Sequence, residues 1–195
     1  MQTAEKNDDA IPSQGNIRKL QSGNLFLVGM MGSGKTTMGK SLARHLGKTF
    51  ADSDEEITRR TGVTIPHIFD VEGEAGFRQR EAAAIRELTA KDNMVLATGG
   101  GAVLAEANRE LLCHNGIIIY LKASVHDLWQ RTRHDRNRPL LQTADPQARL
   151  RELLQQRDPL YQQVADIVIH SGKQSVHTLM LHLVDEIEAF RKIRS

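Results

Sequence analysis

A glycine-rich stretch with a lysine, "GMMGSGKTT" at residues 29–37, directly follows the apolar run "NLFLV". It fits the spacing G-x-x-x-x-G-K-[ST], with Gly29, Gly34, Lys35 and Thr36 at the defined positions. In this pattern a strand ends in a loop whose backbone N–H groups surround a phosphate, and the next helix adds the positive end of its dipole. The sequence therefore predicts a nucleotide-phosphate loop between a buried strand and a helix.

The last two positions of this loop carry its chemistry. Lys35 is expected to reach the β- and γ-phosphates, and the hydroxyl of Thr36 is expected to bind Mg²⁺. A glycine-rich turn without a ligand is the alternative, but the flanking strand and helix argue against it. GTPase switches, motor ATPases, nucleotide kinases and small-molecule kinases all use such a loop, so other motifs must decide the class.

Short apolar runs alternate with amphipathic segments from Leu25 onward. Runs of this length are typical of strands that are buried on both faces of a parallel sheet. The predicted strands are residues 25–28, 94–97, 117–121 and 166–170, with a weaker candidate at 48–52. This alternation predicts an α/β fold, a sandwich of helices around a parallel sheet.

Several helices have recognisable ends. Helices are predicted at 35–46, where Gly47 ends the helix, and at 74–90. Two further helices are predicted to begin at N-caps, one at Ser124 with Asp127 and one at Asp145 with Pro146. A last helix is predicted to start at Ser175, and its inward-facing residues are Val176, Leu179, Leu183, Ile187 and Phe190.

Composition limits the class of protein. The chain has 195 residues, with 26 basic and 24 acidic side chains, and this near balance argues against a general nucleic-acid binder. The single cysteine, Cys113, fits a reducing compartment, and we expect a buried small hydrophobe there rather than a reactive thiol. With no apolar segment long enough for a membrane or a signal peptide, the chain is expected to be cytoplasmic. Residues 1–22 read as a disordered lead, and 23–195 as one domain.

Two carboxylates, Asp52 and Asp54, follow the weaker strand in the stretch "DSD". In open α/β sheets ligands lie at this edge, and residues i and i+2 of an extended chain point the same way. One carboxylate could serve Mg²⁺ through water while the other accepts a hydroxyl proton. Alternatively, either could cap the helix that begins "EEITRR".

Arginines and glycines complete the candidate site. In "GFRQRE", Arg78 and Arg80 diverge on a helix, so at most one faces a pocket; Arg78 could pair with Asp54 or bind an anion, or either could be a solvated charge. The glycines of "ATGGG" (97–101) indicate a close backbone approach to a ligand, or a flexible turn. Arg157, in "QQRDPLY", could clamp a carboxylate.

A run of arginines before the N-cap at residue 145 indicates a mobile lid or, alternatively, a solvated face. The run is Arg131, Arg133, Arg136 and Arg138, with His134 among them.

Together, these residues resemble the shikimate kinase family from Asn24 to Phe190. The motifs that carry the resemblance are "GMMGSGKTT", "FADSDEEI", "FDVEGEAGFRQRE", "ATGGGAV", "RNRPLL" and "RDPLYQQVAD". The resemblance implies a P-loop, nucleoside-monophosphate-kinase-like fold, a three-layer sandwich with a five-stranded parallel sheet, a substrate-binding segment at about 52–82 and a lid at about 131–146. It also implies a monomer that phosphorylates the 3-hydroxyl of shikimate with ATP, in the pathway to chorismate and the aromatic amino acids.

The resemblance assigns roles residue by residue. The catalytic residues would be Lys35, Asp54 and Arg138. Shikimate would be held by Asp54, Arg78, Gly100 and Arg157. The ATP-binding residues would be Gly32, Ser33, Gly34, Lys35, Thr36 and Thr37 at the phosphates, with Arg138 from the lid, Arg131 at the adenine and Gln174 at the nucleotide end. Mg²⁺ would be bound by Thr36 and, through water, by Asp52.

Three other functions compete with this interpretation. A kinase of another small polyol, such as gluconate, shares the loop, but the motifs "DSD", "GFR" and "GGG" together fit it less well. A noncatalytic P-loop module would show no acceptor-specific turnover. RNA binding by the arginine run would need a wider basic surface than a net charge of +2 offers.

Overall fold

A single parallel sheet forms the centre of the molecule. The computed structural model of the chain describes residues 23–135, 137–172 and 174–194. The strands are β1 (Leu25–Val28), β2 (Thr49–Asp52), β3 (Met94–Ala97), β4 (Ile117–Lys122) and β5 (Ile167–His170). They are ordered β2-β3-β1-β4-β5, and each neighbouring pair is parallel. The predicted five-stranded sheet is confirmed, with each strand end within one residue of its expected place. The predicted lead, residues 1–22, lies outside the described residues.

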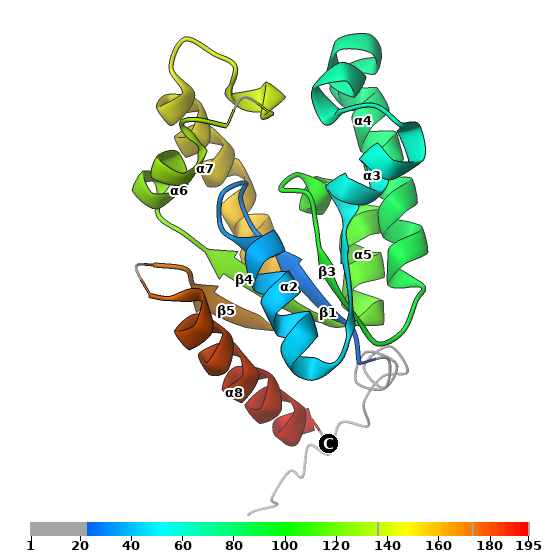
Figure 1. Cartoon of the computed structure of the whole chain (residues 1–195), viewed down its shortest axis with the longest axis vertical. Coiled ribbons are helices and arrows are strands. Elements are labelled where there is room, and N and C mark those ends of the chain that lie inside the picture. Colours follow the sequence, from blue (N-terminus) through cyan, green and yellow to red (C-terminus); the bar gives the residue numbers. More distant parts are fainter. Residues whose placement is uncertain (1–22, 136, 173, 195) are drawn as a thin grey trace, which may run out of the picture.

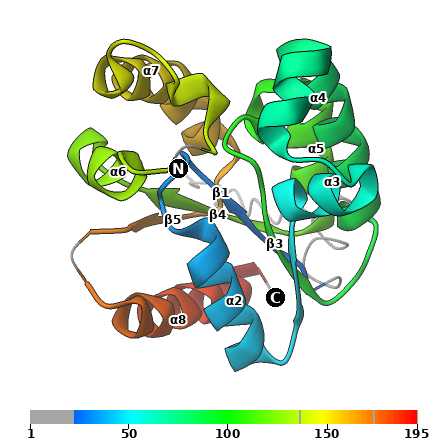
Figure 2. The ribbon, with the colours of Figure 1, turned by 45° about the horizontal axis from the view of Figure 1, so that its top comes forward.

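Helices cover both faces of this sheet, so the three-layer prediction is also confirmed (Figures 1 and 2). They are α2 (Lys35–Leu46), α3 (Ser53–Thr61), α4 (Ile65–Thr89), α5 (Glu106–Asn115), α6 (Val125–Thr132), α7 (Pro146–Val164) and α8 (Val176–Arg194), with short 3-10 turns η1 (Ala102–Leu104) and η2 (Pro139–Leu141). In the described part of the chain, none of these helices has the length and apolarity to span a membrane.

Strand β1 shows how the core divides between the two layers. Alternate residues of a strand point to opposite faces. Leu25 and Leu27 join the buried cluster formed with α2 and α8, whereas Phe26 and Val28 join the cluster formed with α4, α5 and α7. The β1 side chains are all fully buried, as expected for a central strand with helices on both sides.

The predicted helix ends are largely confirmed. Gly47 closes α2 in the left-handed conformation, with φ 63°. The side chains of Ser124, Asp145 and Ser175 each accept a backbone N–H bond three residues on, at 2.9–3.1 Å. The inward-facing prediction for Val176 is wrong, because this side chain is 44% exposed in the first turn of α8. Cys113 is half-buried against the core rather than fully buried.

Helix α4 begins nine residues before its predicted start. The segment "IPHIFDVEG" contains a proline and a glycine, which argue against a helix in the sequence. Pro66 is tolerated because it lies in the first turn, where its missing N–H has no intrahelical partner. Gly73, with φ 68° and ψ −176°, then breaks the helix into two pieces. The predicted start at Glu74 therefore marks the second piece only.

Candidate active site

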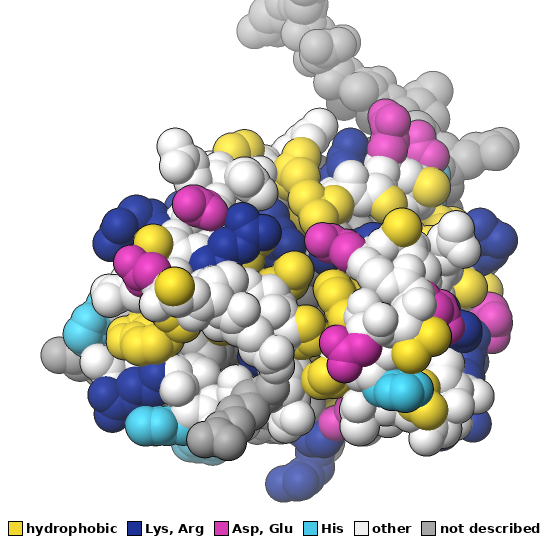
Figure 3. Space-filling view, turned by 90° about the horizontal axis from the view of Figure 1, so that it is seen from above, with side chains coloured by type: hydrophobic (Ala, Val, Ile, Leu, Met, Phe, Trp, Pro, Cys, Tyr) yellow, Lys and Arg dark blue, Asp and Glu magenta, His cyan; other side chains and the backbone are white. Residues whose placement is uncertain are grey.

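Two cavities open at the carboxyl ends of β1, β2 and β3. One is lined by the phosphate loop, and the other, of about 560 Å³, lies beside α3 and α4. Four residues line both cavities: Met31, Asp54, Gly100 and Arg138. Seen from above, basic and hydrophobic side chains gather around the hollow between the two sides of the molecule (Figure 3). The cavities are therefore two parts of one site, and the residues they share lie where they meet.

The phosphate loop connects β1 to α2. Gly34 has φ 95°, a conformation that side chains disfavour, and it supplies no side-chain cap to the first N–H groups of α2. Gly32 is required for packing as well, because a Cβ there would lie 2.6 Å from Cγ2 of Thr132. Uncapped N–H groups at a helix start form a ready anion site, so the local geometry fits a bound phosphate.

Lys35 is folded back on this loop. Its Nζ donates to the carbonyl oxygens of Gly29 and Met30, both at 2.8 Å. Burial lowers the pKa of Lys35 to about 8, although the nearby carboxylates of Asp54 and Asp52 oppose this shift. A phosphate group in the cavity would favour the charged form of this amine.

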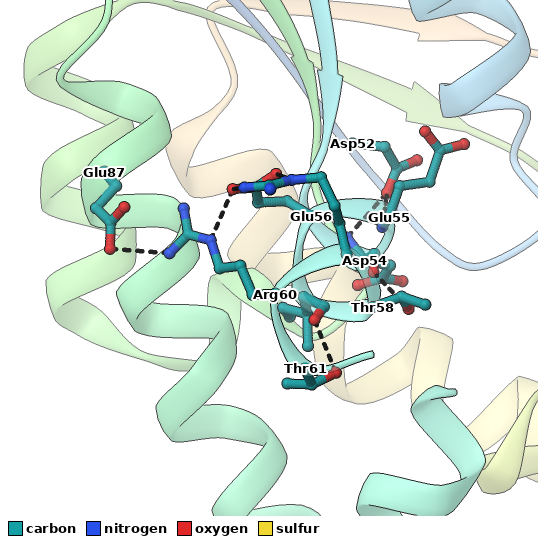
Figure 4. A network of polar contacts seen from close by, with 10 residues as sticks. Asp52, Asp54, Glu55, Glu56, Thr58, Arg60, Thr61 and Glu87 are labelled. Atoms are coloured by element: carbon teal, nitrogen blue, oxygen red, sulfur yellow. Dashed lines mark hydrogen bonds and ion pairs between the residues drawn. The ribbon is translucent and has the colours of Figure 1, made fainter. Parts of the chain in front are cut away.

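The two carboxylate oxygens of Asp52 contact different segments. Its Oδ1 accepts from the backbone N–H of Asp54 at 2.9 Å and thereby caps α3 (Figure 4), and its Oδ2 accepts from the hydroxyl of Thr36 at 2.7 Å. The alternative prediction for Asp52, that it caps the helix that follows, is therefore confirmed. A hydroxyl and a carboxylate placed side by side are also hard oxygen donors of the kind that Mg²⁺ takes together with water and phosphate oxygens. The donor set thus fits the predicted magnesium site.

Asp54 lines both cavities, as expected, but the extended backbone that was expected to direct it there is not present. The chain is no longer extended after Asp52, because α3 begins at Ser53. Asp54 lies in the first turn of α3, and its Oδ1 is buried with no hydrogen-bond partner among the described residues. Burial, followed by the charge of Asp52, raises the pKa of Asp54, while Lys35 opposes the shift. A buried carboxylate with a raised pKa is a suitable acceptor for a hydroxyl proton.

Arg78 pairs with glutamates, so its expected ion pair with Asp54 is not formed. Its guanidinium donates to Glu81 at 2.8 Å and to Glu74 at 2.7 Å, because residues three and four apart share a helix face. Burial works against the charge of Arg78, but Glu81 and Glu74 raise its pKa. Arg80, as predicted, points elsewhere and pairs with Glu72 on the surface.

Glu81 is a site residue that the sequence reasoning missed. It is 1% exposed, it lines the larger cavity, and burial raises its pKa. A Cβ at Gly99 would lie 2.4 Å from Oε1 of Glu81 and 2.7 Å from Oδ1 of Asp54, so the glycine admits both carboxylates. The spacing of Glu81 three residues after Arg78 is the signal that could have found it.

Arg157 reaches the same cavity from α7. It is 2% exposed, and its Nε and Nη1 have no hydrogen-bond partner within the described residues. Burial lowers the pKa of Arg157. Buried N–H groups without a partner are costly unless an anion binds them, and a carboxylate matches the forked geometry of a guanidinium.

Apolar side chains form another part of the larger cavity's lining, which also includes Glu55, Thr58, Arg59, Asp135 and Asn137. Phe69 and Phe77 lie with their ring centroids 4.9 Å apart. The other apolar lining residues are Met31, Ile65, Pro139 and Leu140. A small ligand with an anionic group and a carbon ring would fit this cavity, with the anion at the arginines and the ring against the apolar side chains.

The segment predicted to form a lid contributes two arginines. Arg138 lines both cavities and donates from Nε to Asp135 at 2.9 Å. Arg131 lines the phosphate cavity and donates to the carbonyl oxygens of Gly32 at 3.2 Å and of Gly172 at 3.1 Å.

Of the other residues predicted for the lid and the nucleotide end, those that the structure describes are absent from this lining. Arg133 is exposed, and Arg136 lies outside the described residues. Gln174 is exposed in the loop between β5 and α8, and the described lining of the phosphate cavity does not include it. Its role at the nucleotide end stays a prediction.

Comparisons with known proteins agree on one family. Residues 31–188 match the family described as shikimate kinase. A shikimate kinase of Nitrosospira multiformis is 60% identical over 166 residues, which are 85% of each chain. One of Thiobacillus denitrificans is 63% identical over 153 residues, 78% of this chain and 84% of that one.

Solved structures give the same result. A shikimate kinase from Acinetobacter baumannii, in complex with shikimate, superposes with a TM-score of 0.84 at 49% identity, over 86% of this chain and 93% of that one. A deoxyadenosine kinase from M. mycoides with bound dATP superposes with a TM-score of 0.55 at 13% identity, over 85% and 99% of the two chains. At this low identity, the second superposition shows a shared fold and nothing further.

Proposed function

This chain belongs to the shikimate kinase family, and we propose that it transfers the γ-phosphoryl group of ATP to the 3-hydroxyl of shikimate. The products are shikimate 3-phosphate and ADP, on the pathway to chorismate and the aromatic amino acids. The observation that carries the proposal is that Asp54 and Arg138 line both cavities at once. A proton acceptor and a cation therefore lie where the phosphoryl donor and the hydroxyl acceptor would meet.

The phosphate loop holds the donor. The backbone N–H groups of residues 32–37 surround the ATP phosphates, and Lys35 exchanges its two carbonyl contacts for phosphate oxygens. Arg131 lies at the adenine end. Thr36 and, through water, Asp52 would hold Mg²⁺, which neutralises phosphate charge when bound.

The larger cavity holds the acceptor. Arg78 and Arg157 bind the carboxylate of shikimate, and the backbone at Gly100 contacts its ring. Asp54 orients the 3-hydroxyl and accepts its proton as the phosphoryl group is transferred. Arg138 stabilises the charge on the transferring group, and the lid excludes water. Since phosphoryl transfer depends mostly on positioning and electrostatics, these groups are sufficient.

The organisation of the chain is part of the proposal. Residues 23–195 act as one domain, with the acceptor segment at about 52–82 and the lid at about 131–146. Because one chain lines both cavities, a monomer is sufficient for activity. We also propose that the enzyme is cytoplasmic and has no nucleic-acid or membrane partner. The near balance of charge argues against a general nucleic-acid binder, and the single cysteine fits a reducing compartment.

A panel of hydroxylated acids tests the proposal. The protein is incubated with Mg-ATP and, separately, shikimate, gluconate or no acceptor, and the products are identified by ³¹P and ¹H NMR. We expect phosphorylation of shikimate alone, at its 3-hydroxyl. Phosphorylation of gluconate instead would indicate a polyol kinase, and no acceptor-dependent product would indicate a noncatalytic nucleotide-binding module.

A further inference from the structure

Tyr161 is a fully buried residue with a hydroxyl that the mechanism above does not use. It lies on α7 four residues after Arg157, so the two side chains leave the same face of the helix. Its hydroxyl donates to the carbonyl oxygen of Gly100 and lies 3.7 Å from Sδ of Met30 in the phosphate loop. One phenol on α7 therefore contacts two other segments of the site, which are far from it and from each other in the sequence.

The carbonyl that Tyr161 binds belongs to a closely packed peptide. A Cβ added to Gly100 would lie 3.2 Å from the backbone N of Met31 and 3.7 Å from Nη1 of Arg157. The peptide at Gly100 thus fills the space between the phosphate loop and the guanidinium. A shift of this peptide would change the separation between the phosphoryl donor and the cation that receives the acceptor.

We propose that Tyr161 is a positioning residue that fixes the peptide at Gly100 against α7 and so places Arg157 for the acceptor carboxylate. This inference rests on the proposed function. It assigns Tyr161 no contact with the substrate, because the residue acts through Gly100 and Arg157.

The local structure of α7 explains why such an anchor is needed. Pro159 lies inside the helix between Arg157 and Tyr161. A proline there removes one backbone hydrogen bond and loosens the turn that carries the guanidinium. The bond from Tyr161 to Gly100 ties this turn to the end of β3. Burial also raises the pKa of the Tyr161 phenol, which favours its protonated, donating form.

Tyr120 provides a matched control. The chain contains two tyrosines, and their rings pack against each other at an interplanar angle of 30°, with centroids 4.9 Å apart. The hydroxyl of Tyr120 donates to Oδ1 of Asp158 at 2.6 Å, away from the peptide at Gly100. Tyr120→Phe and Tyr161→Phe therefore each remove one buried hydroxyl from the same ring pair, but only the second removes the contact with Gly100.

Steady-state kinetics of the two variants test the proposal. For Tyr161→Phe we expect the KM for shikimate to rise about tenfold, as is typical when a buried hydrogen bond loses its donor, with the KM for ATP nearly unchanged. Tyr120→Phe should lower the melting temperature to a similar extent but leave both KM values at the wild-type level. A wild-type KM for shikimate in Tyr161→Phe, or an equal rise in both variants, would overturn the proposal.

A measurement on the unsubstituted sequence covers the case in which Tyr161→Phe does not fold. With 3-fluorotyrosine in place of tyrosine, the protein gives two ¹⁹F resonances, which Tyr120→Phe assigns. Saturation with shikimate should shift the Tyr161 resonance more than the Tyr120 resonance, and an unmoved Tyr161 resonance would contradict the positioning role. Wild-type protein that does not phosphorylate shikimate would instead refute the proposed function, and with it this inference.

Discussion

The hydroxyl of Thr36 donates a hydrogen bond to Oδ2 of Asp52 across 2.7 Å. This bond joins the first turn after the phosphate loop to the last residue of β2. The other oxygen of Asp52 caps α3, the helix that carries Asp54. The donor side and the acceptor side of the site are thus connected through one carboxylate, so substitutions near it can separate structural roles from chemical ones.

Asp52→Asn separates capping from metal binding. Asparagine caps a helix about as well as aspartate does, but it carries no charge. The melting temperature should therefore stay near the wild-type value. The Mg²⁺ concentration for half-maximal rate should rise about tenfold, as is usual when an outer ligand of a metal is lost. An unchanged Mg²⁺ requirement would mean that Asp52 only caps α3.

The pH dependence of ATP binding tests the state of Lys35. Its pKa of about 8 in the free protein means that the amine loses its proton above this pH, whereas phosphate contact favours the charged form. ATP affinity should therefore fall as pH rises through 8, by about tenfold at one unit above the pKa. Titration calorimetry between pH 7 and 9 measures this decrease. A flat profile would show that Lys35 stays charged throughout.

Asp54→Asn should have opposite effects on activity and stability. Loss of the proton acceptor should lower kcat at least about 100-fold while ATP affinity changes little. The folded-state pKa of Asp54 is raised, so the free energy of unfolding falls as pH rises through the window between its ordinary and its raised pKa. A neutral amide avoids this cost, and the melting temperature at pH 7 should increase.

Turnover and differential scanning calorimetry check the two effects of Asp54→Asn separately. Near-normal turnover would leave Asp54 with no catalytic role, and a lower melting temperature would contradict the assigned sign of the pKa shift.

Arg138→Ala should slow phosphoryl transfer without weakening acceptor binding. An arginine that stabilises the transferring group typically contributes about 10³-fold or more to kcat. The matched control is Arg133→Ala, since Arg133 belongs to the same segment but is exposed and should have no effect. Single-turnover rates and shikimate KM values distinguish the outcomes. A defect confined to the KM for shikimate would place Arg138 in the acceptor site instead.

Local sequence rules predicted the scaffold well. The strand at 25–28 and the helix at 35–46 have the expected boundaries, because the phosphate-loop pattern itself requires a strand, a glycine turn and a helix in that order. The strand at 94–97 also has its expected boundaries, because it is a short apolar run directly before a glycine-rich turn. The sheet edge where the site residues gather also follows from the parallel topology.

Contacts between distant segments were not predictable in the same way. Asp54 was the carboxylate considered as a partner for Arg78, but Arg78 instead pairs with Glu74 and Glu81 on its own helix. The bond between Tyr161 and Gly100 spans 61 residues, and no local spacing indicates it. The start of α4 was missed because proline and glycine usually end helices, and here one lies in the first turn and the other at a break.

Release of ADP from Mg-ATP, measured with and without shikimate, tests the central claim most directly. If the phosphate loop and the buried arginines form two halves of one site, shikimate should raise the rate of ADP release by orders of magnitude, with one shikimate 3-phosphate formed for each ADP. A rate of ADP release that does not depend on shikimate would contradict the account.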